Sequence, residues 1–171
     1  FFSQYHKIAN YYIQKKSTKK ALDFTKKALG SYHKKFETQY TFDPPNWDFI
    51  DGELIPLSKN MDELFYAEGH QRKVIVDYGL CLLNFSQCLS MQKKYQEAVE
   101  MIDKACRYYH VFPKLYNLSQ LIKGMNLIYN GSKSGVKLIE DSLINLEKLE
   151  KPVSKKSSII LIEEAKKLLE S

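Results

Sequence analysis

The stretch from Tyr78 to Lys114 constrains the fold of this chain more than any other part of its sequence. Its apolar residues recur at helical spacing on both sides of a short polar break, which predicts two amphipathic helices joined by a tight turn. Small residues occur where those two helices must touch, at Ser86, Ala98 and Ala105. Related units lie on each side of this stretch, so the sequence predicts an all-α protein built from helical repeats.

The length and composition are those of one soluble globular domain, with 171 residues of which 44% are hydrophobic and 27% charged. No run of eighteen apolar residues occurs, so we expect no membrane-spanning helix. Cys81, Cys88 and Cys106 show no metal-ligand spacing and are expected to be buried thiols of a reducing compartment. These features predict a cytoplasmic location and no metal or other cofactor.

Positive charge is concentrated at the N-terminal end of the chain. Residues 1–35 contain nine lysines and a single acid, Asp23, although the whole chain carries a net charge of only +6. Such asymmetry favours acidic partners, among them a carboxylate-bearing peptide, a nucleic acid or an anionic surface. A solvated lysine face on a pair of helices explains the same charges without any partner.

Breaks in the helical pattern divide this single domain into segments. In order they are a first repeat at about 2–36, an insert at 37–60, a second repeat with an extended first helix at 60–112, a third repeat at 113–149 and a capping helix at 153–170. Pro44, Pro45 and Pro56 forbid an interior helix in the insert. Its aromatic residues argue against disorder, so we expect an ordered excursion packed on the helices.

The repeats resemble tetratricopeptide repeats, which are about 34 residues long and consist of two antiparallel helices. The unit at 79–112 fills the signature positions with Leu82, Phe85, Ser86, Leu89, Tyr95, Ala98, Ile102 and Ala105. A first unit begins at Phe2, with Tyr5, Ile8, Ala9, Tyr12, Ala21, Thr25 and Ala28 in place. A third unit begins at Pro113, and Gly135, Ile139 and Ser142 continue its pattern. The resemblance implies three repeats and a capping helix in a right-handed superhelix with a concave groove.

One group of such proteins has the same arrangement, with an enlarged segment between the first two repeats. The chain resembles the C-terminal domain of FKBP-type immunophilin co-chaperones, including the aryl-hydrocarbon-receptor-interacting-protein branch. The string LLNFSQCLSMQKKYQEAVEMIDKA at 82–105 is similar to the second repeat of that family. The resemblance implies a protein-binding module that is not itself an enzyme, because peptidyl-prolyl isomerase activity would belong to an upstream domain.

The resemblance also implies a groove that holds the acidic EEVD-type C-terminus of a cytosolic heat-shock chaperone. Members of that family use a carboxylate clamp, in which lysine, asparagine and arginine side chains donate charge-assisted hydrogen bonds to the peptide. Asn10, Asn84 and Lys114 match three positions of the clamp. His6 stands at the first lysine position and Leu118 at the arginine position, so we expect a partly degraded clamp.

Other interpretations of the sequence remain open. The chain could be a scaffold that binds a different protein partner through a more apolar groove, which Leu118 would favour, with the aromatic residues at 108–112 either at its rim or in the core. A weaker alternative is nucleic-acid binding through the lysine-rich first unit, which contains no arginine. Catalysis has the least support, since no histidine pairs with a cysteine or an acid at triad or metal-ligand spacing.

Overall fold

The computed structural model describes residues 2–39, 46–50, 53–57, 69–109 and 112–171. Within these ranges the chain is predominantly helical, so the predicted all-α class is confirmed. The helices are α1 (Phe2–Gln14), α2 (Thr18–Gln39), α4 (Gly69–Met91), α5 (Tyr95–Tyr109), α6 (Pro113–Tyr129), α7 (Ser134–Glu147) and α8 (Lys156–Glu170). A short pair of strands, β1 (Asn46–Ile50) and β2 (Glu53–Leu57), lies between α2 and α4 in the sequence.

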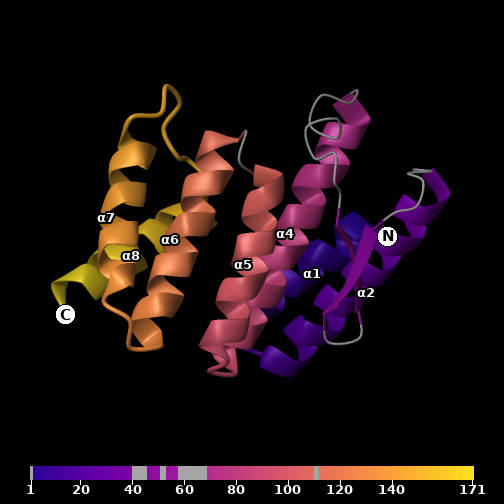
Figure 1. Cartoon of the computed structure of the whole chain (residues 1–171), viewed down its shortest axis with the longest axis horizontal. Coiled ribbons are helices and arrows are strands. Elements are labelled where there is room, and N and C mark those ends of the chain that lie inside the picture. Colours follow the sequence, from indigo (N-terminus) through magenta and orange to yellow (C-terminus); the bar gives the residue numbers. More distant parts are fainter. Residues whose placement is uncertain (1, 40–45, 51–52, 58–68, 110–111) are drawn as a thin grey trace.

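Six of these helices form hairpins, in which α1 packs on α2, α4 on α5 and α6 on α7. Figure 1 shows the hairpins side by side, with α8 crossing behind α6 and α7. We call α1, α4 and α6 the A helices, and α2, α5 and α7 the B helices. Neighbouring hairpins contact each other through α2 with α4 and α5 with α6, so the helices form one continuous stack.

All three A helices end in the same backbone motif. A residue just after each helix has a positive φ, namely Lys16 at 55°, Lys93 at 61° and Gly131 at 85°. The N–H of the following residue bonds to the carbonyl five positions back, from Ser17 to Tyr12 at 2.9 Å, Lys94 to Leu89 at 2.9 Å and Ser132 to Leu127 at 2.8 Å. This Schellman motif satisfies the last carbonyls of a helix. The first helix of each hairpin therefore ends in the same way.

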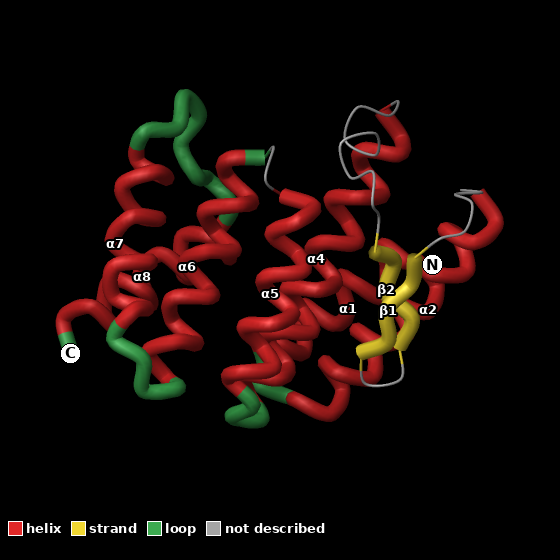
Figure 2. Tube along the Cα trace, viewed as in Figure 1, coloured by secondary structure: helices red, strands yellow, loops and turns green. Residues whose placement is uncertain are grey.

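The insert between the first two hairpins contains the antiparallel strand pair. Its register runs from Asn46 opposite Leu57 to Ile50 opposite Glu53, and β2 contacts α2. Figure 2 shows the pair, in yellow, beside the helices. The sequence predicts an ordered excursion here but not its strands. Pro56 excludes a helix yet fits β2, because both members of a two-stranded pair are edge strands, where proline is tolerated.

Three predicted segment boundaries can be compared with the helices. Helix α2 continues to Gln39, past the predicted end of the first repeat at about residue 36. The first helix of the second repeat, predicted from about residue 60, is described from Gly69 onward, and 60–68 lies outside the described residues. The capping helix, predicted from residue 153, begins at Lys156. Val153 belongs to the preceding linker and packs against the core with its side chain, so its apolar character reflects burial rather than helix.

Small side chains form the contacts between helices. Three pairs at equivalent positions of the first two hairpins are all completely buried, namely Ala9 with Ser86, Ala21 with Ala98 and Ala28 with Ala105. Around them lies a first core cluster that includes Tyr78, Phe85 and Ile102. A second core cluster joins α6, α7 and α8. Leu161 of α8 packs against both clusters and so links them.

Two glycines allow α6 and α7 to approach closely. A Cβ atom on Gly124 would lie 2.7 Å from Cγ1 of Ile139 and 3.0 Å from the carbonyl oxygen of Gly135. A Cβ atom on Gly135 would overlap the carbonyl oxygen of Gly124. Because a helix backbone cannot move aside as a flexible side chain can, a methyl group at either position would force the two helices apart.

We therefore predict that Gly135→Ala lowers the free energy of unfolding by about 1–3 kcal/mol, the usual cost of overpacking. Gly30→Ala is the matched control, since Gly30 lies inside α2 with open space where its Cβ would be. That control should raise stability by about 0.5–1 kcal/mol, because alanine is the better helix former. Urea unfolding followed by circular dichroism measures both changes. Equal effects of the two substitutions would contradict the close approach.

Candidate functional site

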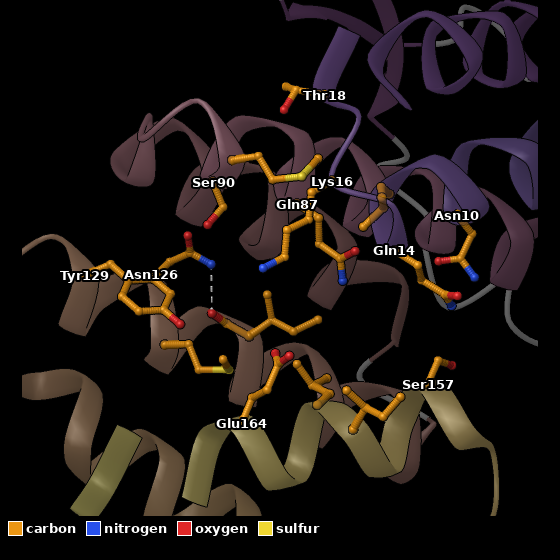
Figure 3. A pocket seen from close by; sticks show the side chains of 16 residues that line it. Asn10, Gln14, Lys16, Thr18, Gln87, Ser90, Asn126, Tyr129, Ser157 and Glu164 are labelled. Carbon is orange, nitrogen blue, oxygen red and sulfur yellow. Dashed lines mark hydrogen bonds between the residues drawn. The ribbon is translucent and has the colours of Figure 1, made fainter. Parts of the chain in front are cut away.

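A cavity of about 650 Å³ lies between the A helices and α8. Figure 3 shows its walls, with α8 on one side and the C-terminal halves of the A helices on the other. The volume lies within the range of about 300–1,000 Å³ that is usual for ligand pockets. We call this cavity the groove pocket.

Amide side chains and apolar side chains line the groove pocket together. The amides are Asn10, Gln14, Gln87 and Asn126, and the larger apolar side chains include Met91, Ile122, Met125 and Leu161. Two charged residues also line it, Lys16 from the turn after α1 and Glu164 from α8. Amides both donate and accept hydrogen bonds, so such a lining can hold a polar chain while the apolar side chains bury its hydrophobic parts.

Several of these lining residues occupy positions that the predicted repeat offsets relate to one another. Asn10 and Gln87 correspond to each other in the first two units, and the same offset carries Gln14 onto Met91. One repeat length further along the chain, Met91 corresponds to Met125. Asn10 is predicted from the sequence as a groove residue, but the others are not. The repeat offsets, applied to Asn10 and its neighbours, are the sequence signal that locates them.

Helix α8 forms the remaining wall. Ala165 of α8 is completely buried in the second core cluster, where Leu118 of α6 is also buried. Ser157, Ile160, Leu161 and Glu164 face the groove pocket. The last helix therefore does more than lie at the end of the stack, because it also covers part of the face that the A helices present.

The five residues proposed for the clamp do not converge on the groove pocket. Asn10 lines it, whereas Lys114 is exposed at the start of α6 and is not part of its lining. Asn84 and His6 are hydrogen-bonded to each other instead. Leu118 is 7% exposed and packs within the second core cluster. The structure thus joins His6 to Asn84 by a hydrogen bond, and of the five residues Asn10 alone lines the groove pocket.

The imidazole of His6 connects α1 to α4. Its Nδ1 atom lies 3.0 Å from Nδ2 of Asn84 and 3.8 Å from the sulfur of Cys81. Because Nδ2 of an asparagine can only donate, Nδ1 of His6 must be the unprotonated nitrogen that accepts the bond. Burial, followed by the positive charges of Lys155 and Lys7, lowers the pKa of His6 to about 4. The ring is therefore neutral at pH 7 and cannot replace the charge of a clamp lysine.

Asn117 and Tyr109 both form hydrogen bonds that hold helices together. Nδ2 of Asn117 donates to the carbonyl of Pro113 at 2.7 Å, and its Oδ1 accepts from Asn145 of α7 at 3.2 Å. Tyr109 is completely buried in the first core cluster, and its hydroxyl donates to the carbonyl of Val76 at 2.7 Å. Of the two places considered for the aromatic residues at 108–112, Tyr109 therefore lies in the core and not at a groove rim, since the close packing of α5 on α4 encloses its ring.

The cysteines show no sign of reactivity. All three are buried, and burial raises the pKa of Cys88 and of Cys106 to about 11 and that of Cys81 further still. Their thiols are thus protonated at neutral pH. Among the described residues, no group of three histidine, cysteine or acidic side chains could hold a metal ion. No helix in the described ranges is both long and apolar enough to cross a membrane.

The depressed pKa of His6 predicts a specific pH dependence of stability. Between pH 6.5 and about 4 the unfolded chain binds a proton at His6 that the folded chain does not, so stability falls as the pH falls through this window. The variant His6→Gln removes this contribution. We expect wild type to lose on the order of 2 kcal/mol relative to the variant between pH 7 and pH 4. Urea unfolding at a series of pH values measures the difference, and parallel profiles would contradict the prediction.

Comparison with protein-family models, with curated proteins and with solved structures returned no match for this chain. Its function must therefore be inferred from the geometry of the groove pocket and from the chemistry of the residues that line it.

Proposed function

We propose that this chain is the tetratricopeptide-repeat module of an immunophilin-type co-chaperone, and that it binds a peptide segment of a protein partner in the groove pocket. The same Schellman ending in all three hairpins, and the matched buried small residues of the first two, support the repeat assignment. The observation that carries the proposal is the lining of the pocket. Equivalent residues of all three A helices, Gln14, Met91 and Met125, face one cavity of about 650 Å³.

The chemistry of the lining suits a peptide better than a small charged metabolite. An extended peptide presents a backbone N–H or C=O group at every residue, and each needs a partner when it leaves water. The amides of Asn10, Gln14 and Gln87 provide both donors and acceptors along one side. Met91 and Met125 have flexible, polarizable side chains that adapt to apolar groups of different shapes.

A second candidate is the acidic C-terminal peptide of a heat-shock chaperone, bound through the partly degraded clamp. One observation favours it. Lys7 and Lys155 both lower the pKa of His6 through their positive charge, so two cations lie near the position where the clamp lysine is missing. Lys155 comes from the linker before α8, outside the helices that carry the clamp pattern. Against this candidate, Leu118 offers no donor at the arginine position.

Blocking the groove pocket tests the main proposal. Ile160 lines the pocket and is 44% exposed, so Ile160→Trp should fill it without disturbing the core. Ile159→Trp is the control, because Ile159 is similarly exposed at 39% on the same helix but does not line the pocket. We expect short peptides selected from a random displayed library to bind wild type and Ile159→Trp alike. Their affinity for Ile160→Trp should fall at least about tenfold.

Fluorescence polarisation with the selected peptides provides the measurement. If the library yields no binders, or if the binders tolerate Ile160→Trp, the groove pocket is not the peptide site. Circular dichroism of both tryptophan variants confirms that a loss of binding does not come from unfolding.

A single matched pair of peptides tests the clamp. An acetylated peptide ending in EEVD should bind about tenfold more tightly than the same peptide with an amidated C-terminus, because the clamp recognises the terminal carboxylate. Asn84→Ala and Lys155→Ala should each reduce that preference, and added salt should weaken the binding. Calorimetric titration measures the affinities. Equal binding of the carboxylate and amide forms would exclude the clamp.

A further inference from the structure

The hairpin of α1 and α2 exposes apolar and aromatic side chains at one end of the stack, opposite α7 (Figure 1). On α1, Ile8 is 36% exposed and Tyr11, one turn further on, is 55% exposed. The ring of Tyr11 lies 5.3 Å from that of Tyr12, which in turn stacks on Phe24 of α2 at 5.7 Å. Together with the lysines beside them these residues form what we call the end face, namely Ile8, Tyr11, Tyr12, Lys15, Lys20, Phe24 and Lys27.

Residues equivalent to Ile8 and Tyr11 are buried at the joint between the first two hairpins. The repeat offset carries Ile8 onto Phe85 and Tyr11 onto Cys88 of α4, which are 2% and 0% exposed. Helix α2 packs against this side of α4, and Oγ1 of Thr25 lies 3.9 Å from Sγ of Cys88. The positions that are open on α1 are therefore those that a preceding helix covers on α4.

The joint between α5 and α6 repeats this arrangement and adds an ion pair. The equivalent positions there are Ser119 and Ile122 of α6, which are 0% and 7% exposed. Beside them, Nζ of Lys123 on α6 lies 2.7 Å from Oδ1 of Asp103 on α5. An acid on a B helix thus pairs with a lysine on the next A helix across a joint of this type.

Positive charge surrounds the rings of the end face. Residues 4–31 contain seven lysines and a single acid, Asp23. The three lysines of the end face are exposed and form no ion pair with the residues that the structure describes. Their Nζ atoms lie over rings of the same face, Lys15 at 5.8 Å from the centroid of Tyr11, Lys20 at 5.3 Å from that of Tyr12 and Lys27 at 5.1 Å from that of Phe24. Such a surface complements a partner with negative charge beside its apolar residues.

We propose that the end face is a docking site for an amphipathic helix of a partner protein, whose stripe of small and apolar residues is flanked by acids. The stripe covers Ile8 and Tyr11 as α2 covers the equivalent residues of α4. The flanking carboxylates pair with the lysines, as Asp103 does with Lys123 at the internal joint. Terminal units of repeat proteins usually have a polar outer face, so an open apolar one indicates an interaction site.

The end face is separate from the groove pocket. None of its seven residues belongs to the lining of that pocket. The proposal therefore goes beyond the proposed function and concerns a second site for a second partner segment.

Other partners fit the end face less well. A second copy that presented the same face would bring like charges together. Single-stranded nucleic acid stacks its bases on open aromatic faces, whereas Tyr12 already stacks on Phe24 and a lysine lies over each of the three rings. An anionic lipid surface attracts lysines but has no use for a surface shaped to receive a helix. A helix with acidic flanks matches both the shape and the charge.

Selection from a displayed library of helical peptides tests the proposal. The peptides are about 20 residues long, long enough for a stable helix, with small or apolar residues along one stripe and glutamate, lysine or glutamine at the flanking positions. We expect selection on the wild-type chain to enrich glutamate over lysine in the flanks. A selected peptide should bind at least about tenfold more tightly than the same peptide with lysines in place of its glutamates. Added salt should weaken its binding.

A proline variant of the selected peptide tests whether a helix is required. Proline in the middle of the peptide breaks the helix and leaves the charges unchanged, so its binding should be lost. Fluorescence anisotropy measures all of these affinities. Failure to select acidic binders, or equal binding of the helical and proline peptides, would overturn the proposal.

A pair of protein variants locates the binding. Tyr11→Glu places a negative charge in the end face and should weaken the selected peptide at least about tenfold. Ile144→Glu is the matched control, because Ile144 is 49% exposed on α7 at the opposite end of the stack and should leave the affinity unchanged. Circular dichroism of both variants confirms that they are folded. Equal effects of the two substitutions would contradict docking on the end face.

Three further titrations separate this site from the alternatives. Ile160→Trp, which blocks the groove pocket, should leave the affinity of the acidic helix unchanged, so the two sites succeed or fail independently. Loss of binding in that variant would place the helix in the groove pocket and overturn the proposal. Oligouridine and vesicles of phosphatidylcholine with phosphatidylserine should bind more weakly than the selected helix. Tighter binding of either one, lost in Tyr11→Glu, would assign the end face to nucleic acid or lipid instead.

Discussion

Close contact between helices through small side chains is the constraint on which the rest of this structure depends. The small residues at these contacts are completely buried, namely Ala9, Ala21 and Ala28 and their counterparts in the second hairpin. The helices are therefore separated by little more than a methyl group. Gly124 and Gly135 bring α6 and α7 together even more closely. Such contacts leave little freedom in the spacing of successive hairpins, and that spacing sets the distance between the A-helix residues that line the groove pocket.

Helix α8 covers part of the face that the A helices form. Leu118 stands where the clamp of the resembled family has an arginine, and in this chain it is buried in the same cluster as Ala165 of α8. An arginine at that position would be a charge buried without a partner, which is strongly unfavourable. The leucine at this position and the docking of α8 are thus two aspects of one arrangement. The groove pocket lies beside α8 and is lined partly by its residues.

The sequence predicts much of the fold because helical periodicity and small residues are local signals. The offset between the first two units, read from apolar positions, recurs in the positive φ values of Lys16 and Lys93. The site is less predictable because it depends on where a distant helix docks. Nothing local in the sequence around Glu164 indicates that it faces Asn126 across a pocket. The bond between His6 and Asn84 likewise joins residues far apart in the sequence and requires the packing of α1 on α4.

Of the side chains of α8, only Ala165 is fully buried. One wall of the groove pocket is therefore held by fewer contacts than the other. A ligand that touches both walls must first have this helix in place, so part of its binding free energy is spent on reducing the conformational entropy of α8. By the same linkage, an occupied pocket restrains the C-terminal helix against local opening. Binding in the groove pocket and the ordering of α8 are thus thermodynamically linked, so each would favour the other.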